Sequence, residues 1–353
     1  MRVKFAHIAL VICLVSPLSV LADSRSDAVD RLFTSYNAAN VPGASVLVMQ
    51  HGEVLYAHAY GAAKLNPRQA ASVETNFRIA SLTKQFTALA VLQLVDRGMV
   101  GLEDPLTKFF PDFPAYGQKI KLKHLLQHTS GLLDYENLMS SQNGQISDEG
   151  VLQLLRQQSG TSFAPGSQYR YSNGAYVLLG LIIQKLDGRP FSQFVREEIL
   201  APLQMNQSLM YERDADISSR AYGHTRSGNG FAQTDQSSTS ATQGDGGLYT
   251  SVADWVQWER ELLQPTLLHP TIFSLLFAPG VLNNGTRTSY GMGWMLSTYR
   301  GLKQVYHTGS SIGFRTAVRR FPEKNFTVVV LVNRADAAPW NTATSVADIY
   351  LFP

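Results

Sequence analysis

Cysteine is almost absent from this chain, and blocks of like charge and long apolar runs are missing as well. The single cysteine, Cys13, lies near the start, so no disulfide framework holds the fold together. The formal net charge of +3 comes without a basic cluster, which argues against nucleic acid or an anionic membrane surface as partner. With 44% apolar residues the composition is that of a soluble globular protein. The partner we expect is a small molecule or a peptide.

The first 22 residues have the pattern of a secretory signal peptide. They carry the basic residues Arg2 and Lys4, continue with a short apolar run broken by serine and proline, and end at the small residue Ala22. The run is too short for a strong transmembrane helix; an uncleaved anchor is the alternative. Cleavage leaves residues 23–353 without cysteine and with a net charge of +1, which is +3 less the two basic residues. We therefore expect a periplasmic or secreted protein with no membrane span after cleavage.

Strand patterns occur near both ends of the remaining chain. Short runs rich in apolar and β-branched residues are separated by brief turns, which favours antiparallel pairing. The runs are 44–50 and 53–60, joined at His51-Gly52, and 303–306, 315–321 and 326–332, the last two joined by a turn at 322–325. We expect both ends of the chain to meet in one sheet.

Helical patterns fill most of the middle. The run 82–95 is apolar nearly all round and stops at Arg97-Gly98, as expected for a buried helix. Further helices are expected at 119–128, 151–157, 175–186 and 191–200, with a loop at 227–247 and a capping box from Ser251 to Asp254. The prediction is an α/β fold of the α+β type in one domain, 23–353. Its α/β part covers about 23–100 and 245–353, and a mainly helical lobe, about 101–244, is inserted.

Three short motifs carry the chemistry: Ser81-Leu82-Thr83-Lys84, Tyr171-Ser172-Asn173 and His307-Thr308-Gly309. The spacing i, i+3 puts Ser81 and Lys84 on one face of a helix. A serine hydroxyl needs a neighbouring base to become a nucleophile, and a lysine supplies one when burial keeps it neutral. The sequence therefore predicts an acyl-transfer site.

These motifs, in this order, resemble the class C β-lactamase family in its broad sense, which includes β-lactamases, D-Ala-D-Ala peptidases, esterases and D-aminopeptidases. Three further segments match family landmarks: 125–132 (LLQHTSGL), 244–250 (GDGGLYT) and 313–315 (GFR). The resemblance covers nearly all of the chain after residue 22. It implies an antiparallel sheet flanked by helices with an inserted, mainly helical lobe.

The resemblance also implies roles for the catalytic residues. Ser81 attacks the carbonyl carbon and carries the acyl group, while Lys84 and Tyr171 share the proton transfer. Which of the two holds the proton is left open. No metal or organic cofactor is implied.

The substrate-binding residues follow in the same way. Asn173 hydrogen-bonds Lys84 and the substrate amide, and the backbone N–H of Ser310 joins that of Ser81 in an oxyanion hole. The resemblance further implies that His307, Thr308 and Gly309 form one wall of the substrate-binding site. β-Lactamases of this class usually have lysine at the position of His307, and a mostly neutral histidine holds a substrate carboxylate less well. This departure favours a peptidase or esterase over an efficient β-lactamase.

Some residues match the spacing or sequence of other functional motifs without the elements that those motifs require. Residues 309–313 match Gly-x-Ser-x-Gly, but that elbow needs a following helix and a later histidine, and neither is expected here. His124 and His128 have a zinc-capable spacing but no third ligand, so helix-end and packing roles are favoured. Tyr135 and Tyr249 are candidates to line the cleft or to pack. Arg315 is a candidate to hold a carboxylate.

The sequence thus predicts a secreted serine hydrolase that forms an acyl-enzyme on Ser81 with D-amino-acid peptides, β-lactams or small esters. Two alternatives stay open: an esterase with little β-lactam reactivity, and a penicillin-binding sensor or scaffold that acylates without turnover.

Overall fold

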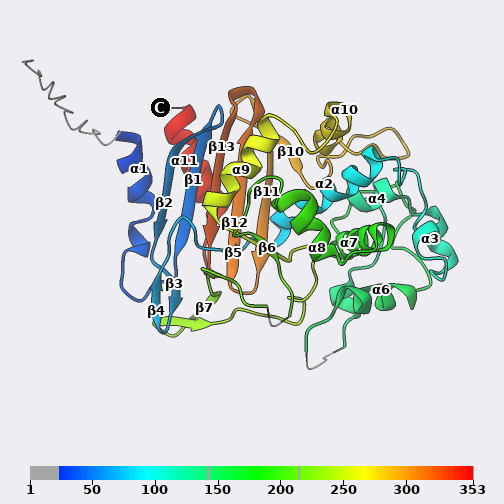
Figure 1. Cartoon of the computed structure of the whole chain (residues 1–353), viewed down its shortest axis with the longest axis horizontal. Helices are drawn as coiled ribbons and strands as arrows, with labels where there is room; N and C mark the ends of the chain where they lie inside the picture. The colour runs from blue at the N-terminus through cyan, green and yellow to red at the C-terminus, as the bar shows by residue number, and fades with distance from the viewer. Residues whose placement is uncertain (1–23, 141–143, 214, 353) are drawn as a thin grey trace, which may run out of the picture.

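A computed structural model describes residues 24–140, 144–213 and 215–352 (Figure 1). The signal peptide predicted over 1–22 lies outside the described residues. The centre is a six-stranded antiparallel sheet in the order β10-β11-β12-β13-β1-β2. Its strands are β1 (Ala44–Gln50), β2 (Glu53–Tyr60), β10 (Met295–Tyr299), β11 (Leu302–Ser311), β12 (Phe314–Phe321) and β13 (Phe326–Val332). Because β1 pairs with both β2 and β13, the prediction that both ends of the chain share one sheet is confirmed.

Eleven α-helices surround this sheet in the described residues. They are α1 (Ser24–Leu32), α2 (Thr83–Asp96), α3 (Leu106–Phe109), α4 (Leu122–Leu126), α5 (Tyr135–Leu138), α6 (Asp148–Arg156), α7 (Asn173–Asp187), α8 (Phe191–Val195), α9 (Val252–Leu263), α10 (Pro270–Phe273) and α11 (Pro339–Leu351). Small sheets join β3 (Ala62–Leu65) to β4 (Arg68–Ala70), β5 (Phe77–Arg78) to β9 (Leu248–Thr250) and β6 (Leu209–Met210), and β7 (His224–Ser227) to β8 (Gly230–Gln233). Helices α3 to α8 gather beyond the β10 side of the sheet (Figure 1).

The two faces of the sheet are both apolar, and alternate residues divide between them. In β13, Val328 and Val330 pack in the cluster that contains α1 and α11, whereas Val329 and Leu331 pack in the larger cluster that contains α2 and α9. Side chains alternate across a strand, so a continuous apolar strand is expected where helices cover both faces.

Helix α2 runs through the larger core, and twelve of its fourteen residues are buried. This agrees with the all-round apolar pattern of the sequence. Because Ser81 precedes α2 directly, the core fixes the position of the predicted nucleophile.

Three local predictions were wrong or incomplete. The expected loop at 227–247 begins with the hairpin of β7 and β8; its strands are polar and largely exposed, so they carry no period-two signal. The helix expected at 119–128 is limited to α4, because Lys121 is extended and His128 has φ +56°. The capping box is only half formed: Ser251 accepts from the Asp254 N–H.

Asp254 itself points elsewhere. Its carboxylate accepts hydrogen bonds from the backbone N–H groups of Gln207 and Ser208 at 2.9 Å each, so α9 is tied to the segment before β6. Among the described residues, no helix combines the length and apolar character needed to cross a membrane.

Candidate active site

Ser81 lies in a 3₁₀ turn (Ala80–Leu82) that leads into α2. Strand β11 approaches this turn closely at Gly309: a Cβ there would lie 2.1 Å from Thr316 Oγ1 and 2.3 Å from the Ile79 carbonyl oxygen. The Thr316 hydroxyl donates to that same carbonyl at 2.9 Å. The bare backbone of Gly309 therefore lets the sheet edge lie against the turn that carries Ser81.

Lys84 is fully buried, and its ammonium nitrogen has three acceptors. It donates to Ser81 Oγ at 3.2 Å, to Asn173 Oδ1 at 2.9 Å and to the Asp245 carbonyl oxygen at 2.6 Å. Burial lowers the pKa of Lys84 to about 8, against the opposing charges of Asp245 and Glu136. The amine is thus close to Ser81 and within reach of its neutral form.

Tyr171 and Asn173 come from the start of α7. The helix begins at Asn173 because the Ser172 hydroxyl accepts from the Ala175 N–H at 3.2 Å. The Tyr171 ring lies 4.9 Å from Lys84 Nζ, and its hydroxyl is buried without a hydrogen bond of good geometry among the described residues. Burial raises the pKa of Tyr171 well above its ordinary value, with the nearby Ser81 hydroxyl opposing. The phenol therefore stays protonated.

His307 is buried behind this group, with 1% of its surface exposed. Its Nδ1 lies 2.7 Å from the Thr308 carbonyl oxygen, which can only accept, so Nδ1 carries the proton. Nε2 then accepts from the Tyr290 hydroxyl at 3.2 Å. Burial, with Lys84 adding to it, lowers the pKa of His307 to about 3. The imidazole is neutral, in line with the sequence-based expectation.

A small cleft of about 100 Å³ opens over Ser81. Asn173 and Ser310 line it with Ser81, whereas Lys84, Tyr171, His307, Thr308 and Gly309 do not and stand behind its wall. The structure thus brings all eight predicted site residues together: three line the cleft, and of the five others Lys84, His307 and Gly309 are buried whereas Tyr171 and Thr308 are half-buried.

Sequence reasoning missed three charged residues that line this cleft: Arg78, Glu136 and Asp245. Glu136 accepts from Asn173 Nδ2 at 2.7 Å, and burial raises the pKa of Glu136. Asp245 Oδ1 is buried without a hydrogen-bond partner in the described part of the chain. The sequence offers only indirect signals for these two acids. Asp245 belongs to the landmark 244–250 and Glu136 follows the cleft candidate Tyr135, but neither residue is part of a catalytic motif.

Arg78, three residues before Ser81, is only 3% exposed. It donates through Nη2 to the Ser240 carbonyl at 3.0 Å and lies over the rings of Tyr211 and Tyr249, at 5.5 and 5.8 Å from their centroids. Within the described residues, Nε and Nη1 have no partner. The cleft therefore carries a buried cation as well as two acids.

The motif at 309–313 lies beside Ser81, and Ser310, Ser311 and Ile312 line the cleft, but it lacks the elements of a nucleophile elbow. A strand, β12, follows Ser311, and no histidine occurs after His307, so residues 309–313 are not a nucleophile elbow. Arg315 donates to the Ser311 and Phe314 carbonyls, at 2.7 Å each. Tyr135 lines the cleft, whereas Tyr249 is buried in packing.

The two spaced histidines also have local roles. His124 Nδ1 accepts from the Lys121 N–H and His128 Nδ1 accepts from the Ser172 N–H. No cluster of three or more metal-capable side chains occurs among the described residues.

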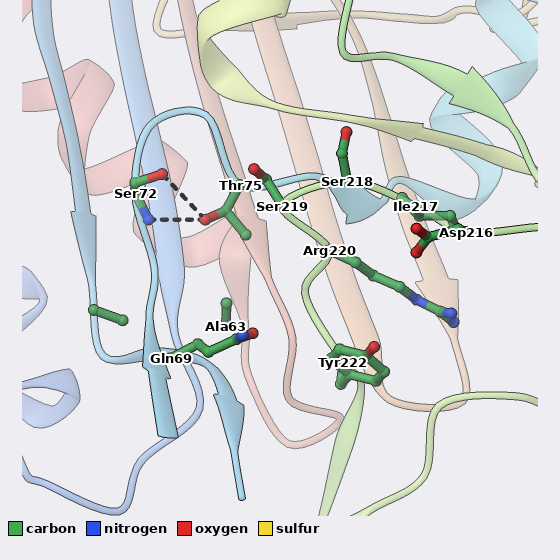
Figure 2. Close-up of a pocket in the computed structure, with 11 residues that line it drawn as sticks. Ala63, Gln69, Ser72, Thr75, Asp216, Ile217, Ser218, Ser219, Arg220 and Tyr222 are labelled. Carbon is green, nitrogen blue, oxygen red and sulfur yellow. Dashed lines mark hydrogen bonds between the residues drawn. The ribbon is translucent and has the colours of Figure 1, made fainter. Parts of the chain in front are cut away.

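A larger hollow of about 480 Å³ lies apart from Ser81 (Figure 2). Among its lining residues, the Ser72 N–H donates to Thr75 Oγ1 at 2.8 Å, and Arg220 is ion-paired with Asp235. Figure 2 shows the Arg220 side chain extended along one side of this hollow. Its described lining contains neither lysine nor histidine to activate a hydroxyl, so size alone does not identify the reactive site.

Comparison with known proteins agrees with this geometry. The chain is 29% identical over 330 residues to penicillin-binding protein 4* of Bacillus subtilis (strain 168), covering 88% of this chain and 72% of that protein. It is 28% identical over 305 residues to protein flp of Staphylococcus aureus (strain MW2), covering 83% of this chain and 60% of flp. The chain thus spans less than two thirds of flp.

Solved structures show the same fold. An octameric penicillin-binding protein homologue from Pyrococcus abyssi matches with a TM-score of 0.78 and 26% identity, over 93% of this chain and 76% of that one. D-amino acid amidase from Ochrobactrum anthropi SV3, complexed with L-phenylalanine amide, matches with a TM-score of 0.78 and 25% identity, over 93% and 97%. The family model described as Beta-lactamase matches residues 29–349. The chain therefore belongs to the beta-lactamase family and is a serine hydrolase of the penicillin-binding protein fold.

Proposed function

We propose that this protein forms a covalent acyl-enzyme on Ser81 and hydrolyses small amides or esters. The observation that carries the proposal is the contact of 3.2 Å between Lys84 Nζ and Ser81 Oγ, made by a buried lysine. A base next to a serine hydroxyl is the requirement for nucleophilic catalysis.

The proposed proton path rests on the lowered pKa of Lys84 and the raised pKa of Tyr171. Neutral Lys84 takes the proton as Ser81 Oγ bonds to the acyl carbon, because its pKa of about 8 makes the neutral amine accessible. Tyr171 stays a phenol and donates its proton to the leaving nitrogen or oxygen as the acyl bond breaks. The Lys84 ammonium then returns a proton to Tyr171. Water releases the acyl group in a second step with the same groups acting in reverse.

The substrate-binding residues have supporting roles in the proposal. The backbone N–H groups of Ser81 and Ser310 hold the oxyanion, and Asn173, which already bonds Lys84, accepts or donates to the substrate amide. His307, Thr308 and Gly309 form the wall behind them.

For substrates we favour D-amino-acid peptides and amides over β-lactams. His307 offers no cation for a β-lactam carboxylate, and the acids Glu136 and Asp245 suit a substrate with an amino group. Similarity to a D-amino acid amidase and to a penicillin-binding protein supports this class. The esterase and the acylating sensor or scaffold are the alternatives.

We further propose export, with residues 1–22 as a cleaved signal peptide and 23–353 as one catalytic domain with an inserted helical lobe at about 101–244. N-terminal sequencing of periplasmic or secreted material should begin at Asp23. Material that begins at Met1 would remove the argument for cleavage.

The function is tested by timed intact-mass measurement with a β-lactam, a D-amino acid amide and a neutral ester. Wild type should gain and then lose the acyl mass, whereas Ser81→Ala should gain none while remaining folded. Ser311→Ala tests the rejected elbow motif: Ser311 lines the cleft but has no role in the proposed reaction, so this variant should still gain and lose the acyl mass. If the wild-type protein gains the acyl mass and never loses it, the sensor or scaffold alternative is indicated. If it turns over only the neutral ester, the esterase alternative is indicated. An active Ser81→Ala with an inactive Ser311→Ala contradicts the proposal.

A further inference from the structure

His128 is a buried residue beside the site that the proposed mechanism does not use. It lies in the landmark 125–132 just after α4, is 0% exposed, and has φ +56°. Positive φ is uncommon outside glycine, although histidine adopts it more often than most residues, so this backbone conformation is expected where surrounding contacts fix it. His128 contacts the rings of Tyr169, Tyr176 and Tyr290 as well, but several of its contacts are to Tyr171 and its two chain neighbours.

The backbone on both sides of Tyr171 is hydrogen-bonded to this one residue. The Arg170 N–H donates to the His128 carbonyl oxygen at 2.9 Å, and the Ser172 N–H donates to His128 Nδ1 at 3.1 Å. Since a backbone N–H can only donate, Nδ1 is unprotonated and Nε2 carries the hydrogen. That Nε2 is buried and without a partner among the described residues.

The ring of His128 also packs on the ring of Tyr171. Their centroids are 4.2 Å apart, and Tyr290 lies on another side of His128 at 4.6 Å. Tyr290 in turn hydrogen-bonds His307. His128 thus packs between the Tyr171 segment and Tyr290, in addition to the direct ring contacts of Tyr171 with Tyr290 and His307.

Tyr171 depends on these contacts because its own hydroxyl has no well-formed hydrogen bond to fix it. With only the nearby Ser81 hydroxyl as a polar partner among the described residues, the position of the phenol depends mainly on its backbone and on its ring packing. We propose that His128 is the positioning residue of Tyr171, holding the phenol at the distance from Ser81 and Lys84 that proton transfer requires. This inference rests on the proposed function.

The competing explanation is that His128 only stabilises the fold. His124 serves as the comparison that separates this explanation from a positioning role. It is 7% exposed, and its Nδ1 also accepts a backbone N–H, that of Lys121, at 3.2 Å. It differs from His128 in having no ring contact with Tyr171 among those found in the described chain. Loss of either histidine side chain removes a hydrogen bond from a backbone N–H, buried at His128 and part-buried at His124, but only the loss of His128 should affect acylation.

The experiment compares His128→Asn, His128→Ala and His124→Ala by the rate at which a β-lactam or neutral ester acylates Ser81. Asparagine tolerates positive φ and places an acceptor near the position of Nδ1, so it should keep the rate within tenfold of wild type. Displacement of a catalytic group by 1 Å costs about 100-fold in rate, and His128→Ala should lose about that much with KM nearly unchanged. His124→Ala should change the rate by less than about threefold, even where its melting temperature falls.

A double-mutant cycle shows whether the effect passes through Tyr171. In a Tyr171→Phe background, His128→Ala should add little further loss, because the group it positions is already gone. Should His128→Ala fail to fold, His128→Gln replaces it, since its acceptor lies at the Nε2 end and not at Nδ1.

Three results would overturn the inference: a wild-type acylation rate per folded molecule in His128→Ala or His128→Gln, an equal loss in His124→Ala, or additive losses in the cycle. Absence of acylation in wild type is a different result, and it would contradict the proposed function itself.

Discussion

At Lys84, burial and hydrogen bonding act in opposite directions on one proton. Three acceptors within 3.2 Å of Nζ stabilise the ammonium, yet the loss of solvent prevails and lowers the pKa to about 8. The lysine therefore has two roles near neutral pH. Its charged form donates hydrogen bonds to Ser81, Asn173 and Asp245, and its neutral form accepts the serine proton.

The first prediction concerns the pH dependence of acylation. Because the neutral fraction of Lys84 grows as pH rises through about 8, the acylation rate should climb between pH 6 and pH 9 and then level off. Rapid-quench mass measurement on a neutral ester gives this profile without titration of the substrate. Lys84→Arg should lose at least about 1,000-fold, since a guanidinium stays protonated. A flat profile would assign the proton transfer to another group.

The second prediction concerns His307. Its pKa of about 3 leaves no charge to hold a substrate carboxylate at neutral pH. His307→Lys should therefore increase acylation by a penicillin, which bears a carboxylate, by about tenfold relative to a neutral ester, the gain expected from about 1.4 kcal/mol of added ion pairing. Rates for both substrates are measured on both variants. An equal effect on the two substrates would show that position 307 does not face the carboxylate.

How far the site could be predicted differs from residue to residue. Ser81, Lys84 and Asn173 were identified because their residue types and order are specific to one chemistry, and the structure brings them within hydrogen-bond distance. Glu136 was not identified, because a single acid between two motifs has no periodic or spacing signal. Its role depends on Asn173 Nδ2, a contact made across 37 residues.

At the scale of elements, the contact between β11 and the turn of Ser81 decides the geometry of the site. Gly309 has no room for a side chain, since a Cβ would overlap Thr316 and the Ile79 carbonyl. The third prediction is that Gly309→Ala destabilises the fold by about 1–3 kcal/mol, as overpacking does, and also lowers acylation by moving the strand away from Ser81. Urea unfolding and the acylation rate measure the two effects.

Gly101→Ala is the control for this prediction. Its added Cβ would lie no closer than 3.7 Å to its nearest neighbour, the Asp104 carboxylate, so the substitution should change neither stability nor acylation appreciably. A Gly309→Ala variant as stable and as active as Gly101→Ala would show that the strand accommodates the methyl group.

The elements themselves were predictable where their pattern is periodic. The runs at 44–50 and 326–332 became β1 and β13 with the same bounds, because nearly continuous apolar residues suit a strand buried on both faces. The hairpin of β7 and β8 was missed, since it is held by ladder hydrogen bonds and a turn at Gly228 (φ +54°) and not by an apolar face. The end of α4 depends on the left-handed His128, which tertiary contacts impose.

At the scale of the whole molecule, buried histidines set the response to acid. Burial lowers the pKa of His124 to about 4 and that of His307 to about 3, and it also lowers the pKa values of His128 and His224. The unfolded chain, with pKa values near 6.5, binds these protons earlier. Stability should therefore be lost as pH falls from about 6.5 toward 4.

The fourth prediction is that the urea midpoint decreases from pH 7 to pH 5, with net proton uptake on unfolding at pH 5. Asp148 and Glu136 act in the opposite direction, because burial raises the pKa of Asp148 to about 8 and also raises that of Glu136, so the folded chain binds the additional protons. The four histidines outnumber these two acids, so stability should still rise with pH in this range. Equal midpoints at the two pH values would mean that the histidines titrate normally in the folded state.

The pairing of β1 with β13 also sets an order of events during synthesis. Residues 44–50 lie against residues 326–332, and a ribosome adding ~5–20 residues per second separates them by roughly 15 to 55 s. During that interval β1 can pair with β2 but has an open edge. The helices from α3 to α8 are made of neighbouring segments and can form while translation continues. The sheet closes only when its last strands have emerged, so the turn that carries Ser81 acquires its β11 wall at the end of synthesis.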